Sequence, residues 1–470
     1  MVVTGDYQCN VCKSITRIKV QLGWLDKYPV RIRCGNCKIS IYGNVYLDQK
    51  NAGYSIKLKN VNPLDPGQLP DFIVEVSGEL LTDKIRIYTE SKSDVFSPFF
   101  KNGVFVMGEN IEHFKRSTLL FLYKIDNEWP IVKRINELWF NESHGYLRKE
   151  LHNVLDKTPF PVDNELELLR AVHFLNTRFI QIFAGGYFKK ITDHIFNELK
   201  NINSTQLLLL ANHFENNLGS YEKKLFNTLD KFVQKFHMFI PIFGLDFYSD
   251  IKHREESIKQ LGLTTVDFED IKDFYTDTFE DISDVLNLIV AYNNLKHRGD
   301  FKEMKSNVID SIQEIKDYQK MQKKGRKLEF INGQESFDKI FVSKVDNRLR
   351  NAIAHRSYIY NVDTQKLKYY PSGDVSRGST ESLYLTEFIQ ECFKLMRTCI
   401  GLAEIVYQTR KFSYINKGIE ARPFNHYFPS SEKKRTNPKR KTNQNKNQNK
   451  NKKKNLKKLA KKNRKINKKK

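Results

Sequence analysis

The sequence predicts a multidomain protein with a β-rich N-terminal part, a mostly α-helical C-terminal half and a disordered basic tail. The first 47 residues contain two Cys-x2-Cys pairs and short runs in which apolar and polar residues alternate, as in half-buried strands. From about residue 110 to residue 412, apolar residues recur at the 3.6-residue period of helices. The last 40 residues are rich in lysine and asparagine and almost lack apolar side chains, so we expect no core there.

The two cysteine pairs are Cys9 with Cys12 and Cys34 with Cys37, and 21 residues separate them. Four thiolates at this spacing can converge on one Zn²⁺, and a domain this small needs such a link to fold. The runs "ITRIKVQL" and "PVRIRC" between the pairs alternate like strands. We therefore expect a zinc ribbon with one structural Zn²⁺. Chance pairing and a redox role are the alternatives, and the sequence does not tell whether the ribbon binds RNA, DNA or protein.

We expect five segments along the chain. Residues 1–47 form the zinc ribbon, and residues 48–110 form a β-rich unit with runs such as "YSIKLKNV" and "FIVEVSGEL". Residues 111–264 form a helical region, residues 265–412 a helical bundle, and residues 413–470 a linker and the basic tail. The double glycine of "AGGYF" at 184–188 lacks the surroundings of a phosphate-binding loop and predicts a turn.

Most of the net charge of +24 belongs to the tail, since residues 431–470 hold 20 Lys or Arg and one acid. Such a tail attracts polyanions without sequence preference, although a compositional run that aids solubility is an equal alternative.

The N-terminus lacks the pattern of a signal peptide, and no run of about 18 uncharged apolar residues predicts a membrane span. Six cysteines do not suggest a disulfide framework in so long a chain. These features predict a cytoplasmic protein without membrane contact.

Residues 267–284 contain eight acids and one lysine, and several of the acids recur at helical spacing. The recurring acids are Asp270, Asp273, Asp277, Asp281 and Asp284. Ile271, Phe274, Ile282 and Leu286 mark a rough inner face. The stripe is either a solvated helix face or a docking surface for the tail or a partner. A helical stripe spreads carboxylates apart, which argues against a metal site.

The segment "VDNRLRNAIAH" at 345–355 has two opposite faces when it is placed on a helical wheel. The inward sector holds Val345, Leu349, Ala352 and Ile353, and the outward sector holds Asn347, Arg350, Asn351, Ala354 and His355. Asn351 and His355 are i,i+4 neighbours, so the amide would be able to orient the imidazole. The outward face thus offers a permanent cation, a proton carrier and an orienting amide. A merely solvated face is the alternative.

These three groups suit phosphodiester cleavage in RNA. The 2′-OH attacks the adjacent phosphorus once a base takes its proton, and histidine performs this task near neutral pH. A guanidinium stabilises the negative charge that develops on the phosphorane. No metal is needed for this chemistry.

The string "RNAIAH" resembles the R-x4-6-H motif, with a polar residue after the arginine, of HEPN domains. The resemblance implies a HEPN-like helical bundle at 265–412 and metal-independent endoribonuclease activity. It also implies that Arg350 and His355 are catalytic with support from Asn351, and that two domains pair so that both motifs face one cleft. The following stretch "RSYIYNVDTQKLKYYPSG" predicts a loop or hairpin, which fits such domains.

A second segment, "YNNLKHRGDF", places Asn293 and His297 at the same i,i+4 offset and adds Lys296. Some HEPN-like proteins carry a similar segment, so these residues are candidates for the same cleft. The alternative is an ordinary helix C-terminus, with basic side chains near the helix dipole and Gly299 as the terminator.

Two functions stay open at this stage. The first is a regulated endoribonuclease, an antiviral or toxin-like abortive-infection effector that acts on RNA as a homodimer or larger oligomer. Its N-terminal half would sense a trigger, for example a protein, by analogy of domain arrangement. The second is a non-enzymatic nucleic-acid-binding or scaffold protein with a degenerate HEPN fold.

Overall fold

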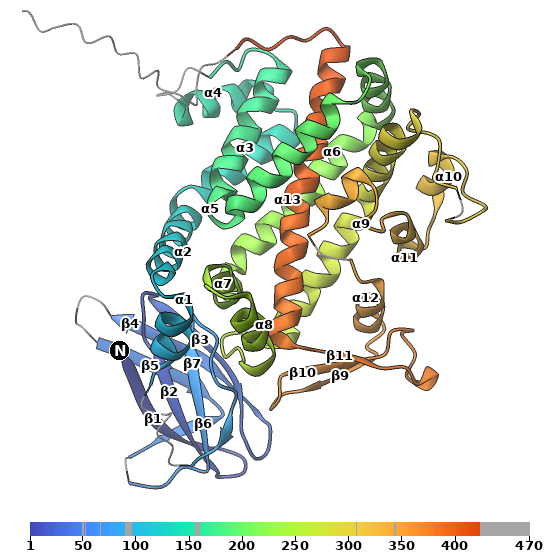
Figure 1. Cartoon of the computed structure of the whole chain (residues 1–470). Coiled ribbons are helices and arrows are strands. Elements are labelled where there is room, and N and C mark those ends of the chain that lie inside the picture. The colour runs from blue at the N-terminus through green and yellow to red at the C-terminus, as the bar shows by residue number, and fades with distance from the viewer. Residues whose placement is uncertain are drawn as a thin grey trace, which may run out of the picture. The chain divides into compact units, whose positions relative to one another are not determined.

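The computed structural model describes residues 1–48, 51, 53–65, 67–89, 96–155, 160–306, 308–342 and 345–423. Met1–Asp156 and Pro161–Arg422 together form one compact unit, which is shown in Figure 1. The second unit, Lys157–Phe160 with Pro423–Lys470, has only Phe160 and Pro423 among the described residues. The predicted basic tail at 431–470 therefore lies outside the described residues.

The N-terminal region is β-rich, as the sequence predicts. Its strands are β1 (Val2–Cys9), β2 (Ile15–Gln21), β3 (Lys27–Arg33), β4 (Ser40–Asp48), β5 (Gly53–Lys59), β6 (Val61–Leu64), β7 (Phe72–Ser77) and β8 (Arg86–Ile87). One sheet has the order β6-β1-β2-β7-β8, and a second has the order β3-β4-β5. Within the first sheet, β2 and β7 pair in parallel, whereas the other neighbours are antiparallel.

Both sheets combine strands from the two segments that the sequence analysis treats separately. The boundary expected at residue 47 falls inside β4, and β1 and β2 pair with β6 and β7 from beyond it. Alternate residues of β3 and β4, such as Val30 and Val45, are buried in a core that also includes Val76 of β7. The strands of the two segments thus contribute to one core.

The rest of the described chain is mostly helical. The helices are η2 (Phe99–Val104), α1 (Phe105–Met107), α2 (Asn110–Asn127), α3 (Trp129–Phe140), α4 (His144–Val154), α5 (Glu165–Lys200), α6 (Ser204–Gln234), α7 (Phe236–Gly244), η3 (Leu245–Phe247), α8 (Ile251–Gln260), α9 (Phe268–Arg298), α10 (Ile315–Lys320), α11 (Lys324–Lys327), η4 (Leu328–Phe330), η5 (Ser336–Ile340), α12 (Asn347–Ala354), η6 (Val375–Arg377) and α13 (Leu385–Asn416). No helix in the described ranges is both long enough and apolar enough to cross a membrane.

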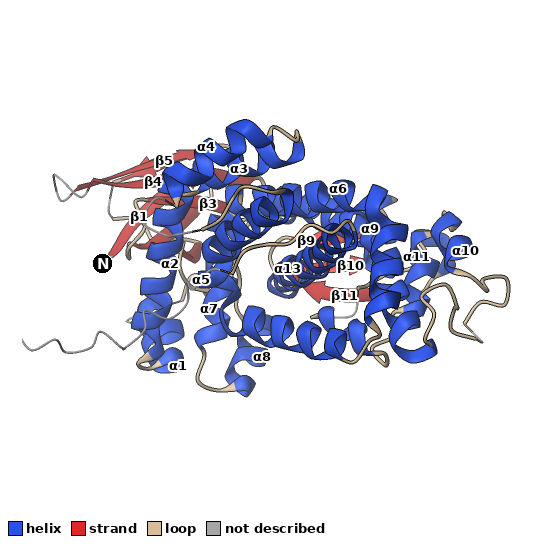
Figure 2. Ribbon diagram, turned by 90° about the horizontal axis from the view of Figure 1, so that it is seen from above, coloured by secondary structure: helices blue, strands red, loops and turns tan. Residues whose placement is uncertain are grey.

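Helix α13 is the central element of the helical region. It packs against α5, α6, α7, α8 and α9, and Figure 2 shows it with these helices around it. Residues on both sides of the expected boundary at 264/265 therefore share one core. The predicted turn at 184–188 is wrong, because these residues lie inside α5, where Phe183 and Ala184 are buried. Tertiary packing of this kind outweighs the low helix propensity of glycine.

The acidic stripe lies on α9, and its expected inner face is confirmed, since Ile271, Phe274, Ile282 and Leu286 are buried. Three of the acids contact side chains of α6, although Asp277 is still exposed to solvent. Lys231 Nζ lies 2.5 Å from Asp277, Thr228 Oγ1 donates to Asp281 at 2.8 Å, and Lys224 pairs with Asp284. The stripe is thus partly solvated, since Asp273 and Asp277 are exposed, and it also forms ion pairs and a hydrogen bond with α6 that the sequence did not predict.

A short three-stranded sheet follows α12. It has the order β11-β10-β9, with β9 (Tyr358–Asn361), β10 (Lys366–Tyr369) and β11 (Glu381–Tyr384). The pairing of β9 with β10 is antiparallel, so the hairpin predicted after "RNAIAH" is present.

Candidate functional site

Helix α12 carries the predicted catalytic residues and begins with a capped N-terminus. The Asp346 carboxylate accepts a hydrogen bond from the Arg348 N–H at 2.8 Å, which satisfies one of the free donors of the first turn. The predicted inward positions are buried, and those named as outward are partly or fully exposed. The helical wheel therefore orients α12 correctly.

Arg350 is held by Glu280, which is far from it in the sequence, and by its neighbour Asn351. Its Nε donates to Glu280 Oε1 of α9 at 2.8 Å, and Nη2 donates to the same oxygen. Its Nη1 donates to Asn351 Oδ1 at 3.2 Å, and the guanidinium lies 5.9 Å from the centre of the Phe279 ring. Lys324 also binds Glu280, through Oε2 at 2.7 Å. Glu280 thus receives two cations on its two oxygens.

His355 is the C-cap residue of α12 and is exposed. The helix ends in a Schellman motif, in which the Arg356 N–H donates to the Ile353 carbonyl at 3.1 Å and the Ser357 N–H donates to the Ala352 carbonyl at 2.8 Å. Arg356 occupies the left-handed position with a φ of 54°, where glycine is usual. This motif fixes the backbone on which His355 projects.

The imidazole of His355 packs against Gly373, in the turn that follows β10. A Cβ atom built on Gly373 would lie 2.8 Å from His355 Cδ2, and the φ of Gly373 is +74°. Ser357 Oγ donates to the Gly373 carbonyl at 2.6 Å and holds this turn against the end of α12. Both the close approach and the positive φ require glycine here.

The structure brings Arg350 and Asn351 together, but the expected contact between Asn351 and His355 is not among the described hydrogen bonds. The Asn351 side-chain oxygen accepts from Arg350, and the Asn351 carbonyl accepts from the His355 N–H at 2.9 Å as part of the helix end. Asn351 therefore orients the guanidinium rather than the imidazole. Among the described residues of α12 and its caps, His355 is the one histidine.

The second predicted segment lies elsewhere along α9. Asn293 is fully buried, donates to Asp338 Oδ1 at 2.8 Å and accepts from the Phe337 N–H at 2.9 Å. Lys296 pairs with Glu198 of α5 at 2.9 Å, and His297 Nε2 accepts from the Ser336 N–H at 3.1 Å. These side chains join α9 to η5 and α5.

Asn293 is 13 residues beyond Glu280, which corresponds to about 20 Å along the helix axis. Within one chain the segment is therefore not brought to Arg350. Gly299 ends α9 in a left-handed conformation with a φ of 82°, as the alternative interpretation of this segment expects.

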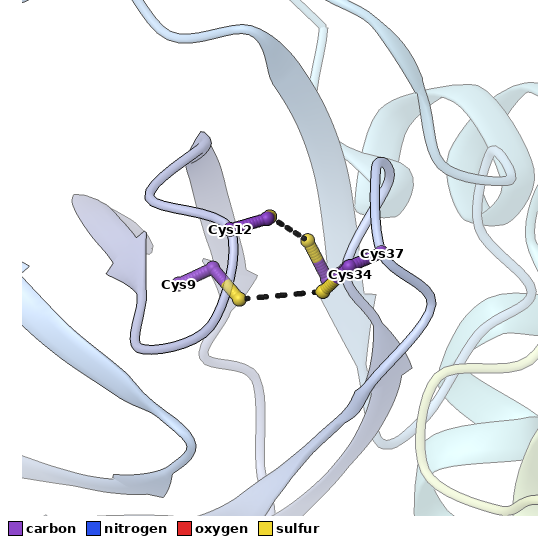
Figure 3. Close-up of side chains that lie close together, drawn as sticks. All are labelled: Cys9, Cys12, Cys34 and Cys37. Atoms are coloured by element: carbon purple, nitrogen blue, oxygen red, sulfur yellow. Dashed lines mark hydrogen bonds between the residues drawn. The ribbon is translucent and has the colours of Figure 1, made fainter.

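The four N-terminal cysteines form a candidate metal site (Figure 3). Their Sγ atoms all lie within 4.8 Å of one another, with Cys9 and Cys37 at 3.6 Å and Cys12 and Cys34 at 3.5 Å. Cys9 ends β1, and Cys34 directly follows β3, so the site joins the two N-terminal sheets. The predicted convergence of the four thiols is present.

The two cysteine loops have the same backbone design. The Lys13 N–H donates to the Cys9 carbonyl, and the Lys38 N–H donates to the Cys34 carbonyl, both at 3.1 Å. Lys13 and Lys38 both have a positive φ, 66° and 63°. Each loop thereby turns its two sulfurs toward the opposite loop.

The thiol chemistry fits a cation. Burial raises the pKa of Cys12, but hydrogen bonds with Ser14 and the neighbouring thiols outweigh this effect and lower it to about 6, whereas hydrogen bonds among the same thiols raise the pKa of Cys37. A thiol that ionises near neutral pH is a ready metal ligand. A tetrahedral zinc–thiolate centre with bonds of about 2.3 Å places its sulfurs about 3.8 Å apart, close to the observed separations.

Sequence reasoning missed the residues that complete the α12 site. Glu280 lies 70 residues before Arg350, and Lys324 lies on a short helix of its own, so no local pattern connects them.

The sequence also did not predict a cavity of about 110 Å³ lined by α3, α5, α6 and α13. In its wall the buried Glu404 accepts from Gln408 at 2.7 Å and lies 3.2 Å from His173 Nε2. Its lining comes from four helices, which explains why no motif marks it.

No family model, curated protein or solved structure matches the chain.

Proposed function

We propose that the protein is a metal-independent endoribonuclease that cleaves RNA through attack by the 2′-OH. The observation that carries the proposal is the outer face of α12, where an exposed His355 follows an Arg350 whose guanidinium is oriented by Glu280 and Asn351. The resemblance of "RNAIAH" to the HEPN motif supplies the reaction class. We further propose that residues 265–412 function as a HEPN-like bundle.

In the proposed reaction, His355 takes the proton of the 2′-OH, and the 2′ oxygen attacks the adjacent phosphorus. The bond from phosphorus to the 5′ oxygen breaks, and the leaving 5′ oxygen receives a proton from a second histidine. Arg350 stabilises the charge on the phosphorane oxygens. The products end in a 2′,3′-cyclic phosphate and a 5′-OH.

The second histidine requires a second chain. A two-fold pairing of the outer faces of α12 places two copies of His355 and Arg350 in one cleft. The active species is then a homodimer or a larger homo-oligomer. The N-terminal half senses a trigger, for example a phage protein, and the protein acts as a cytoplasmic antiviral defence effector.

Glu280 sets the resting state of Arg350 in this proposal. A phosphate competes with Glu280 for the guanidinium, and the bonds from Nε and Nη2 are then transferred to phosphate oxygens. Lys324 stays on the other oxygen of Glu280 at 2.7 Å, so the carboxylate keeps a partner when Arg350 moves. This lowers the electrostatic cost of releasing the arginine.

The test is cleavage of total cellular RNA by the purified full-length protein, with and without EDTA and with its trigger present. We expect cleavage in EDTA by the wild type and loss of cleavage in His355→Ala and Arg350→Ala. The arginine substitution removes a charge-stabilising donor worth on the order of 3 kcal/mol of transition-state stabilisation. His253→Ala and Arg348→Ala are the matched controls, because both residues are exposed and Arg348 shares α12.

The proposal fails if the triggered protein leaves RNA intact with and without metal, or if cleavage survives His355→Ala. It also fails if EDTA stops cleavage while the cysteine site keeps its metal.

The metal of the cysteine site is Zn²⁺ in our proposal, held by Cys9, Cys12, Cys34 and Cys37. We expect one zinc per chain in metal analysis and slow alkylation of all four thiols in the native protein. A strong chelator should make the exposed Cys37 reactive first, whereas the buried Cys392 and Cys399 stay protected as internal controls. Four thiols that react freely in untreated protein, or a sample without zinc, would contradict this assignment.

A second candidate function is a nucleic-acid-binding or scaffold protein with a degenerate HEPN fold. The observation in its favour is the Arg350–Glu280 pair, which gives the arginine a structural partner. Two results together would indicate a scaffold. The wild type would show no cleavage, and Arg350→Ala would keep its RNA binding.

A further inference from the structure

The three-stranded β3-β4-β5 sheet has one buried and one outward side, and the pleat decides which residues belong to each. Tyr28, Val30 and Ile32 of β3 and Ile41 and Val45 of β4 are buried. Successive side chains of a strand point to opposite sides, so the residues between them project outward. Figure 1 shows these strands in the N-terminal part of the chain.

Two tyrosines and three lysines dominate the outward side. Tyr42 and Tyr46 of β4 are 38% and 39% exposed, and Lys27, Lys57 and Lys59 are also exposed. We call these five residues the tyrosine–lysine face. The strand register places Lys59 opposite Tyr42 and Lys27 opposite Tyr46.

Cations lie directly beside both rings. Lys59 Nζ is 5.5 Å and Arg31 Cζ is 6.0 Å from the centre of the Tyr42 ring, and Lys27 Nζ is 5.8 Å from the centre of the Tyr46 ring. These contacts hold each ring between strands rather than leaving it free in solvent. Each exposed ring therefore has a positively charged group within 6.0 Å of its centre.

The charge of this face is largely uncompensated by described residues. No described acid forms an ion pair with Lys27, Lys57 or Lys59, whereas Arg31 pairs with Asp270 at 3.3 Å. Among the outward residues of β3, β4 and β5, Asp48 is the one acid, and its carboxylate accepts from Asn51 at 2.7 Å at the end of β4. Small polar side chains would be enough to keep this face in contact with water. The exposed rings of Tyr42 and Tyr46 and the excess of lysine therefore call for another explanation.

We propose that the tyrosine–lysine face binds single-stranded nucleic acid. Unpaired bases stack on Tyr42 and Tyr46, which lie four residues and hence about 13 Å apart along β4. The lysines on the flanking strands bind the phosphates. Antiparallel sheets with outward aromatic side chains are used in the same way by common RNA-binding modules.

The proposal names a surface for the RNA that α12 would cleave, but it does not depend on cleavage. It also differs from the expected action of the basic tail, because stacking requires unpaired bases and aromatic rings. The basic tail at residues 431–470 contains no Phe, Trp or Tyr and can only contribute charge.

The test uses the full-length His355→Ala protein, so that the RNA stays intact, and measures the anisotropy of labelled oligouridylate and oligothymidylate. We expect Tyr42→Leu and Tyr46→Leu each to weaken binding about tenfold, within the range for loss of one base-stacking ring. Tyr42→Phe and Tyr46→Phe should retain the wild-type affinity. Tyr146→Leu is the matched control, because Tyr146 is exposed and contacts Lys149 on α4.

The double variant Lys57→Gln with Lys59→Gln should reduce the salt dependence of binding. The slope of log K against log salt should fall by about 1.4, from about 0.7 for each phosphate contact on a single strand. The tail contributes equally to every variant, so it does not affect the differences. Melting temperature and bound zinc, measured in parallel, show whether each variant is folded.

The proposal is overturned if the folded leucine variants bind oligouridylate as tightly as the wild type, or if Tyr146→Leu weakens binding equally. It is also overturned if the tyrosine substitutions weaken duplex binding to the same extent. An acidic peptide whose binding depends on both tyrosines, together with oligonucleotide binding that does not, would make the face a protein-binding surface instead. Because binding is measured in a cleavage-deficient variant, failure of this proposal and failure of the ribonuclease proposal give different results.

Discussion

The guanidinium of Arg350 uses a geometry that lysine cannot reproduce. Two of its nitrogens donate to one oxygen of Glu280, and the third donates to Asn351. A lysine has one donor centre and would satisfy only part of this set. The same planar arrangement suits two phosphate oxygens, so an arginine oriented by Glu280 is already shaped for an anion.

Asn293 and Asn351 allow a residue-scale prediction, since both were candidates for one cleft but have different surroundings. Asn293→Ala removes the partner of Asp338 Oδ1 and of the Phe337 N–H, and should cost about 3 kcal/mol of the free energy of unfolding. Asn351→Ala removes one partly exposed bond at 3.2 Å and should cost less than about 1 kcal/mol. Urea denaturation of both variants measures these values.

Cleavage should show the opposite order, with Asn351→Ala impaired more than the folded fraction of Asn293→Ala. If Asn293→Ala is as stable as the wild type but inactive, the prediction is wrong and Asn293 belongs to the active site.

At the scale of single elements, the sequence predicts best what depends on near neighbours. The two cysteine loops, the inward face of α12 and the hairpin of β9 and β10 are set by spacing within a few residues, and each is present. The parallel pairing of β2 with β7 depends on residues more than 50 positions apart. Such pairing leaves no local pattern, and for this reason the division at residue 47 does not match the sheets.

The first turn of α5 allows a prediction of pH dependence. Glu167 accepts from Arg422 Nε at 2.8 Å, and this hydrogen bond is the main reason that its pKa falls from 4.5 to about 2. A carboxyl with a lowered pKa in the folded state stabilises the fold above its unfolded pKa, and this stabilisation is lost as the pH falls. Glu167→Gln should therefore be less stable than the wild type at pH 6, and the difference should shrink between about pH 4.5 and pH 2.

Thermal unfolding of both proteins across this range measures the effect. Glu165→Gln is the control, because Glu165 shares the first turn of α5 but makes none of the described bonds to Arg422. A difference between Glu167→Gln and the wild type that stays constant from pH 6 to pH 2 would contradict the prediction.

At the scale of the whole molecule, α9 connects the β-rich region to α12. Arg33 of β3 pairs with Asp267, the N-cap of α9, at 2.6 Å, and Glu280 of the same helix holds Arg350. A second connection runs from Lys38, in the second cysteine loop, to Asp363 at 2.7 Å, in the turn between β9 and β10. Both connections join segments that are far apart in the sequence, so composition and periodicity did not predict them. They give the proposed sensing region direct contact with the elements that hold Arg350 and His355.

The distribution of charge gives the last prediction, which concerns the tail. Residues 431–470 carry +19 of the net +24, so their deletion leaves the first 430 residues with +5. Deletion should lower nonspecific RNA affinity and reduce the slope of log K against log salt by about 0.7 for each lost phosphate contact. The melting temperature should stay nearly unchanged, because these residues offer almost no apolar surface to a core. A tail of the same composition in scrambled order should restore wild-type binding, since counterion release carries no sequence information. An unchanged salt slope after deletion would show instead that the tail does not contact phosphates, and the scrambled tail would then have nothing to restore.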